Sequence, residues 1–202
     1  MKIIVFDASS FNEQGNNEKE KSLSIYPEST LRVLPDTALL IPKRPLFLPE
    51  LQGPIKAYVA WAIKISRLGR CVSERFAERY YDKVSIAACL VAEGFCEQMR
   101  LLNGSDIIGY SFDGAVCLGA WKDISEFEKL EGSIQIEGQE ALIEEPDWKR
   151  KADKAIALLS KYQTIRQGDI IILKTDAHLE LSIDKHLTGA LDGTELLSVN
   201  LK

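Results

Sequence analysis

The segment from 147 to 175 restricts the possible folds more than any other part of the chain. Residues 147–162, DWKRKADKAIALLSKY, have the apolar spacing of an amphipathic helix. The side chains expected on its buried side are Trp148, Ala152, Ala155, Ile156 and Leu159. Residues 168–175, GDIIILKT, then predict a buried strand that is entered through a Gly-Asp turn. The chain must therefore combine helix and sheet.

Several other segments have the composition of strands. Residues 55–65, IKAYVAWAIKI, alternate and are rich in Val, Ile and aromatic side chains, which predicts a strand. MKIIVFD at 1–7 predicts an initial or edge strand. TLRVL at 30–34 and ALLIP at 38–42 predict short extended pieces next to prolines.

The last third of the chain is predicted to add more strands. SIQIEG at 133–138 predicts a strand with Gly138 at its turn. HLELSID at 178–184 and ELLSVNL at 195–201 predict two antiparallel strands about an LDG turn. The whole pattern is α+β and dominated by sheet, without an internal repeat.

Four further segments give less regular signals. VSERFAERYYDKV at 72–84 predicts a helix capped by its serine. SIAACLVAEGF at 85–95 fits a strand or a buried helix, and periodicity does not separate the two. The glycine-rich stretch IIGYSFDGAVCLGAW at 107–121 is predicted to be a loop that lines a site. The polar stretch at 8–22 predicts a mobile loop.

Composition excludes several classes of protein. A formal net charge of −5, without a basic stripe, argues against a nucleic-acid partner. No apolar run approaches the roughly 20 residues that span a bilayer, and the apolar run at the N-terminus is too short for a signal peptide. The cysteines lack a CxxC pair, so they predict buried thiols of a reducing compartment rather than a zinc site. We therefore expect a cytoplasmic protein without a membrane partner.

Three motifs in order carry a resemblance to a known family. They are the block AIKISRLGRCVSERFAERYYDKVSIAACLVAEG at 62–94, the loop YSFDGAVCLGAW at 110–121, and LLSKYQTIRQGDIIILKTD at 158–176. Together they resemble the fumarylacetoacetate hydrolase family over roughly residues 35–200. The family's loop contains K-S-F-D and ends in G-P-W, and its C-terminal signature contains P-G-D-V-I-L-T-G-T-P.

The resemblance implies a fold and an assembly. It implies a β-rich α+β fold of rolled mixed sheets with a few flanking helices, usually as a homodimer. The expected domain covers residues 35–202. Residues 1–34, an N-terminal strand plus a polar loop, are expected to be part of that domain or appended to it.

The resemblance also implies a chemistry. Typical members hydrolyse, isomerise or decarboxylate small β-diketo or 2-keto acids with a bound Mg²⁺, Mn²⁺ or Ca²⁺. A hard divalent ion held by carboxylates chelates two substrate oxygens and stabilises the enolate that forms.

The residues of this chain depart from the implied metal site. Aligned without a gap, Tyr58 and Ala60 stand at the family's Glu-x-Glu pair, and Cys89 stands at its metal-binding aspartate. Tyr110 replaces the lysine that precedes S-F-D. A phenol or a thiol is a poor ligand for a hard cation, and alanine offers no donor atom. The resemblance therefore predicts a preserved fold without the metal, and no other cofactor.

Other positions keep only part of the family pattern. The G-T-P turn becomes Lys174-Thr175-Asp176, which retains Thr175, and the prolines of the loop become Cys117 and Ala120. Asp113 is retained, either beside the site or as a residue that orders its own loop through hydrogen bonds.

Two glutamates, a histidine and three cysteines have both a functional and a structural interpretation. Glu93 and Glu97 are four residues apart and fit either a weak alternative metal site or a solvated helix face. His178 fits an acid–base group or a surface histidine. Cys89, with Cys96 and Cys117, fits a soft-metal or thiol site, or simply buried small apolar side chains.

Three functions remain open from the sequence. The first is a non-catalytic member of the family, a binding or structural homodimer with a possible small carboxylic-acid ligand. The second is an active metal-dependent hydrolase, isomerase or decarboxylase whose ligands lie elsewhere. The third is a pocket with metal-free chemistry that uses Tyr58, Tyr110, Lys174 or His178.

Overall fold

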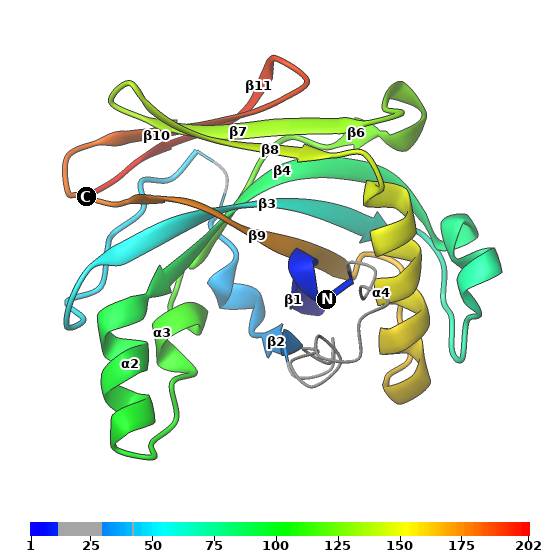
Figure 1. The fold of residues 1–202 in the computed structure, drawn as a ribbon, viewed down its shortest axis with the longest axis horizontal. Helices are drawn as coiled ribbons and strands as arrows, with labels where there is room; N and C mark the ends of the chain where they lie inside the picture. Colours follow the sequence, from blue (N-terminus) through cyan, green and yellow to red (C-terminus); the bar gives the residue numbers. More distant parts are fainter. Residues whose placement is uncertain (12–29, 42) are drawn as a thin grey trace, which may run out of the picture.

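The computed structural model describes residues 1–11, 30–41 and 43–202, and within them the strands form two sheets (Figure 1). The larger sheet has the order β2-β1-β9-β3-β4-β5, and β6 also pairs with β4. Its strands are β1 (Ile3–Asp7), β2 (Arg32–Leu34), β3 (Ile55–Ile65), β4 (Tyr81–Ala92), β5 (Val116–Leu118), β6 (Lys122–Asp123) and β9 (Ile170–Glu180). The α+β prediction is confirmed.

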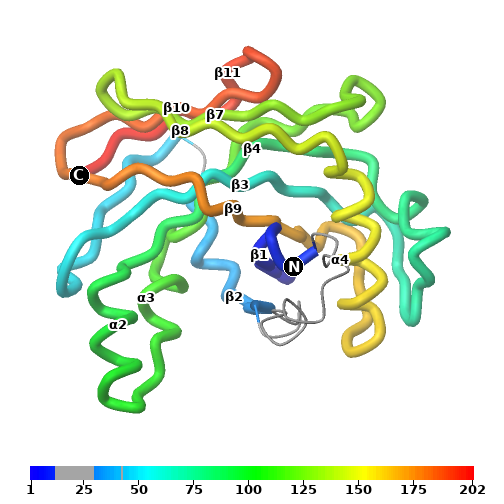
Figure 2. Tube along the Cα trace, in the orientation of Figure 1, coloured from blue at the N-terminus to red at the C-terminus, as the bar shows by residue number. Residues whose placement is uncertain are grey.

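The smaller sheet has the order β11-β10-β7-β8. Its strands are β7 (Leu130–Ile136), β8 (Gln139–Glu145), β10 (His186–Leu191) and β11 (Thr194–Asn200). It lies over one face of the larger sheet, whereas α2 (Glu93–Leu101) and α3 (Ile108–Ser111) project from the opposite side (Figure 2). The larger sheet therefore has one face against a second sheet and one face toward two short helices.

Apolar side chains on the two faces of the larger sheet form separate clusters. The main cluster lies between the two sheets and α4 (Trp148–Tyr162), where the rings of Trp61 and Trp148 meet edge to face with centroids 5.8 Å apart. The second cluster lies on the face toward α2 and α3 and contains small side chains such as Ala60, Ala62 and Ala87. Small side chains on that face leave room for a cavity.

The predictions for 55–65 and 147–162 are confirmed as β3 and α4, and 168–175 becomes the first part of β9. The initial strand is β1, which pairs with both β2 and β9 and is therefore not an edge. For the segment 8–22, only the 3₁₀ turn η1 (Ala8–Phe11) lies within the described residues.

The helix predicted over 72–84 is wrong in part. Residues Glu74–Tyr80 form the 3₁₀ helix η4, and β4 begins at Tyr81. Pairing with β3 along most of β4 overrides the local helical spacing, because tertiary contacts outweigh propensity. The ambiguous segment 85–95 contains both alternatives, since it is strand up to Ala92 and helix from Glu93.

The first strand predicted for the closing hairpin is wrong. Residues 178–180 belong to the end of β9, and the partner of β11 is β10. The turn between them is as predicted: Asp192 and Gly193 have φ of 48° and 71°, the positive values of a tight hairpin turn. The strand at 133–138 is confirmed as the end of β7, but its partner β8 was not predicted.

The remaining described segments form short helices, short strands and 3₁₀ turns. The predicted loop at 107–121 contains α3 and β5, and of the two extended pieces only 30–34 contains a strand, β2. Further 3₁₀ turns are η3 (Asp36–Ala38) and η5 (Ile124–Glu126). None of the helices in the described part of the chain is long and apolar enough to cross a membrane.

Candidate functional site

A cavity of about 290 Å³ opens on the face of the larger sheet that α2 and α3 cover. Its walls come from β1, β2, β3, β4, β5 and β9 of the sheet and from the two short helices. The volume is close to the lower end of the range for small-molecule pockets, roughly 300–1,000 Å³. The cavity can therefore hold a small organic molecule but not a large cofactor.

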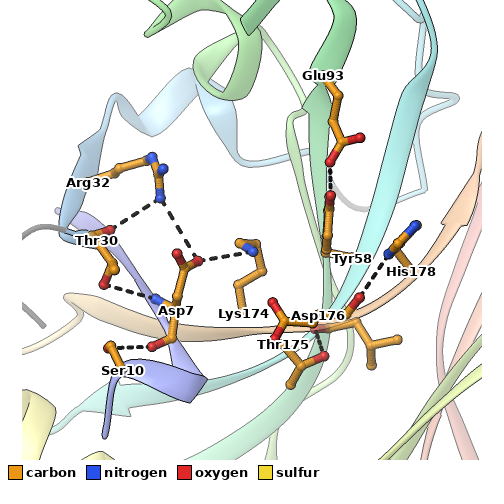
Figure 3. Close-up of polar contacts among 11 residues, drawn as sticks. Asp7, Ser10, Thr30, Arg32, Tyr58, Glu93, Lys174, Thr175, Asp176 and His178 are labelled. Carbon is orange, nitrogen blue, oxygen red and sulfur yellow. Dashed lines mark hydrogen bonds and ion pairs between the residues drawn. The ribbon is translucent and has the colours of Figure 1, made fainter. Parts of the chain in front are cut away.

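A carboxylate and two cations form the charged centre of this cavity (Figure 3). Asp7 and Lys174 are direct partners in the parallel pairing of β1 with β9, and Lys174 Nζ lies 3.0 Å from Asp7 Oδ1. Arg32 Nη1, from β2, lies 4.0 Å from the same oxygen. Thr30 holds both neighbours, because its hydroxyl accepts from the Asp7 amide and its carbonyl accepts from Arg32, each over 3.2 Å.

Tyr58 of β3 connects this charged centre to α2. Its hydroxyl donates to the carboxylate of Glu93, which also lies 2.7 Å from Lys56 Nζ. Lys174 Nζ lies 4.3 Å from the centre of the Tyr58 ring, a favourable cation–π distance. Tyr58 therefore contacts the lysine with its ring and the glutamate with its hydroxyl.

Tyr110 of α3 contacts Arg32, the other cation of the charged centre, in a similar way. The guanidinium of Arg32 lies 4.6 Å from the centre of the Tyr110 ring, and the Tyr110 hydroxyl donates to Asp106 over 2.9 Å. Burial and the hydrogen bond to Asp106 raise the pKa of Tyr110, so the phenol keeps its proton at neutral pH.

Cys89 lies on the wall of the cavity and is buried. Burial raises its pKa to about 12, although the charge of Lys174 acts in the opposite direction. The group is therefore a thiol rather than a thiolate at neutral pH, which makes it a weak nucleophile and a weak ligand. Cys96 and Cys117 are also buried, but Cys71 is exposed, so the prediction of buried thiols is wrong for Cys71.

The structure brings together seven of the residues singled out in the sequence. They line one cavity and are Tyr58, Cys89, Glu93, Cys96, Glu97, Tyr110 and Lys174. Glu93 and Glu97 both lie on α2, as their spacing predicted, but Glu93 is already paired with Lys56 and Tyr58.

Four further candidates do not line the cavity. Ala60 is fully buried in the adjacent cluster. Asp113 is exposed at a second groove and, within the described residues, makes no side-chain hydrogen bond that would order its loop. Thr175 donates to the carbonyl of Val59 over 2.8 Å, and exposed His178 lies with its ring 4.9 Å from that of Tyr58.

Asp7 and Arg32 were not predicted as site residues. The sequence does contain a signal for Asp7, because the apolar run before it resembles the run that precedes Lys174. Asp7 ends β1, and the parallel pairing places it directly opposite Lys174 within β9. Arg32 carries no such signal, since its position depends on the pairing of β2 with β1.

The donor atoms of the cavity do not fit a hard divalent cation. Within the described residues, no group of three or more His, Cys, Asp or Glu side chains is arranged to hold a metal ion. At the positions of the implied ligands stand the phenol of Tyr58, the methyl of Ala60 and the thiol of Cys89. Mg²⁺, Mn²⁺ and Ca²⁺ favour carboxylate and carbonyl oxygens instead.

No protein-family model and no curated protein sequence matches the chain. Solved structures do resemble it along its whole length. Fumarylpyruvate hydrolase from Pseudomonas aeruginosa, crystallised with Mn²⁺ and pyruvate, has a TM-score of 0.77 at 16% identity, over 100% of this chain and 89% of that one. The 5-carboxymethyl-2-hydroxymuconate delta-isomerase from Mycobacterium smegmatis has a TM-score of 0.77 at 17% identity, over 99% and 78%.

A protein from Yersinia pestis CO92 assigned to the fumarylacetoacetate hydrolase family has a TM-score of 0.80 at 18% identity, over 100% of this chain and 93% of that one. Identities this low describe a shared fold and not a shared activity. The chain has the fold of the fumarylacetoacetate hydrolase family.

Proposed function

We propose that this chain is a binding protein with the fumarylacetoacetate hydrolase fold, which holds a small carboxylic acid without the metal-dependent reaction. The observation that carries the proposal is the ammonium of Lys174 inside the cavity. It lies over the ring of Tyr58, one of the positions at which the resemblance implies a metal ligand.

Electrostatics supports this proposal. A fixed positive charge repels a divalent cation, and two unit charges 4 Å apart interact by about 4 kcal/mol near a protein surface. Asp7, the acid nearest to the ammonium, is engaged by Lys174 at 3.0 Å and by Arg32 at 4.0 Å. A metal ion would have to displace both cations to use this carboxylate.

Glu93 is also unsuited to a metal, because Lys56 and Tyr58 both engage it. The thiol of Cys89 has its pKa raised to about 12, so a metal would need to displace its proton. Asp7 and Glu93 thus both face cations of the protein itself, and around Asp7 two cations face one carboxylate. A carboxylate ligand would balance the second cation.

Titration calorimetry with Mg²⁺, Mn²⁺ and Ca²⁺ tests the proposal. We expect no saturable binding of any of the three ions up to millimolar concentration. The variant Lys174→Met serves as the comparison, because it removes the repelling charge and frees Asp7. Saturable binding of one ion to the unmodified protein at millimolar concentration or tighter would overturn the proposal.

The second candidate is an active metal-dependent hydrolase, isomerase or decarboxylase on small β-diketo or 2-keto acids. It is favoured by the fold neighbour from Pseudomonas aeruginosa that was crystallised with Mn²⁺ and pyruvate. Turnover of an acylpyruvate that requires Mn²⁺ and stops with EDTA would select this candidate.

The proposed assembly is a homodimer. Its support in the structure is a groove lined by residues from 36–41 and 44–47, where the side chains of Phe47 and Ile41 are 71% and 54% exposed. Large apolar side chains gathered at one surface favour burial against another chain. Sedimentation equilibrium measures the mass directly, and a monomer at tens of micromolar would contradict the dimer.

A further inference from the structure

We infer that the cavity selects monocarboxylates over dicarboxylates, with Lys174 and Arg32 as the carboxylate anchor and Glu97 as the excluding group. This inference rests on the proposed function and specifies its ligand. The ligand class is a small aliphatic acid with one carboxylate and a short apolar chain.

The side of the cavity formed by β1, β2 and β9 has one excess positive charge within the described residues. Lys174 and Arg32 are two cations, and both of them pair with a single anion, the carboxylate of Asp7. Their side chains are only 14%, 31% and 25% exposed, so water screens this charge less than it would at the surface. An excess charge in a partly buried cavity attracts a counter-ion, and here the counter-ion is an anion.

Both cations keep donors for a ligand. An ammonium has three N–H groups and a guanidinium has five, of which the contacts to Asp7 and Thr30 use a part. The rings of Tyr58 and Tyr110 pack against these two cations. A carboxylate with two oxygens can accept from both cations at once.

The wall next to these cations is apolar. It consists of Val5, Leu34, Cys89, Ala115 and Val116. Their apolar atoms line the cavity, and a short hydrocarbon chain can lie against them. A cavity of about 290 Å³ lies near the lower end of the range for small-molecule sites, which favours a small acid.

The α2 side of the cavity presents an acid without a partner within the described residues. Glu97 is exposed on α2, lines the cavity, and has no ion pair or hydrogen bond within the described part of the chain. Its neighbour Arg100 is 3.7 Å from Asp106 and is balanced by it. A second carboxylate on the α2 side of the cavity would lie near Glu97. Two negative charges repel each other as strongly as opposite charges attract at the same distance, so Glu97 disfavours this second carboxylate.

The test uses two acids of equal chain length and one neutral analogue. Butyrate, succinate and butyramide are titrated into the protein with EDTA present, and binding is followed by calorimetry and by NMR chemical shifts. We expect saturable binding of butyrate, at least tenfold weaker binding of succinate, and none of butyramide. Butyrate affinity should fall as salt rises, because the anchor is electrostatic.

Two sets of variants separate the anchor from the excluding group. Lys174→Met and Arg32→Gln should each weaken butyrate roughly 10- to 100-fold, the effect of one charge-assisted hydrogen bond. Lys64→Met is the matched control, because Lys64 lies near Trp121 at 5.8 Å and does not line the cavity. Glu97→Gln should bring succinate to within about threefold of butyrate.

Each result has a definite meaning. Equal affinity for butyrate and succinate in the unmodified protein, or no effect of Glu97→Gln on succinate, would refute the selectivity. Absence of butyrate binding would refute the anchor, whereas saturable metal binding would refute the proposed function separately. If Lys174→Met fails to fold, Arg32→Gln and the salt dependence still decide the role of the cations.

Discussion

The variant Asp169→Asn should destabilise the protein, because Asp169 fastens the start of β1 to the start of β9. The side chain is 3% exposed and accepts three contacts. The amide of Lys2 donates to one oxygen over 2.8 Å, and the amide of Arg166 and Lys2 Nζ contact the other at 2.9 Å each. Asparagine has the same shape, but its NH₂ group would face one of these donors.

The expected loss follows from those contacts. A hydrogen bond to a charged group contributes about 1.5–3 kcal/mol to the free energy of unfolding. Leaving a buried N–H donor without a partner adds to the loss. Because the single oxygen of the asparagine side chain can still accept from one amide, we expect a loss of about 3 kcal/mol rather than the full sum. For a domain of this size that loss lowers Tm by about 6–12 °C.

The assay is thermal and urea unfolding followed by far-UV circular dichroism, with Asp123→Asn as the matched control. Asp123 also accepts from a backbone amide and a lysine, but its side chain is 46% exposed. The control should shift Tm by a few degrees at most. If the two variants shift Tm equally, burial does not determine the strength of the Asp169 contacts and the reasoning is wrong.

The pH dependence supplies an independent check on Asp169. Burial by itself raises the pKa of this group, but the hydrogen bonds from Lys2 and Arg166 outweigh it and lower the pKa below its usual value. Because the folded pKa lies below the unfolded one, the stabilisation is present at neutral pH and is lost as the pH falls below about 4. The stability difference between wild type and Asp169→Asn should therefore shrink in acid.

Two further predictions concern α4 and α2. Burial raises the pKa of Asp153 to about 6, so its contribution to stability is present below pH 4 and lost as the pH rises past 6. Asp153→Asn can keep the hydrogen bond from Tyr81 and should be about 1 kcal/mol more stable than wild type at pH 8 but not at pH 4, measured by urea denaturation. Gly94→Ala would set a methyl 2.7 Å from the carbonyl oxygen of Gln52 and should cost about 1–3 kcal/mol. Gly104→Ala, with its nearest atom at 3.4 Å, is the control, and an equal loss in both would contradict the steric argument.

The sequence alone was sufficient for elements whose residues repeat with a clear period. The helix at 147–162 and the strand at 55–65 each bury one pattern of side chains, and a local pattern suffices to predict them. The three ordered motifs were sufficient to predict the fold. They also singled out Tyr58, Cys89 and Tyr110 as candidate site residues, and these three line one cavity.

Only the tertiary structure decided the boundary at Tyr81 and the charge of the cavity. Residues 72–84 have helical spacing, but strand pairing with β3 takes over from Tyr81, because long-range hydrogen bonds and burial outweigh local propensity. Asp7, Arg32 and Lys174 lie far apart in the sequence and meet because β1 pairs with β2 on one side and β9 on the other. The order of strands in a sheet is set by packing over the whole chain. For that reason the sequence predicted several residues that line the cavity, and the pairing of strands determined which charges meet there.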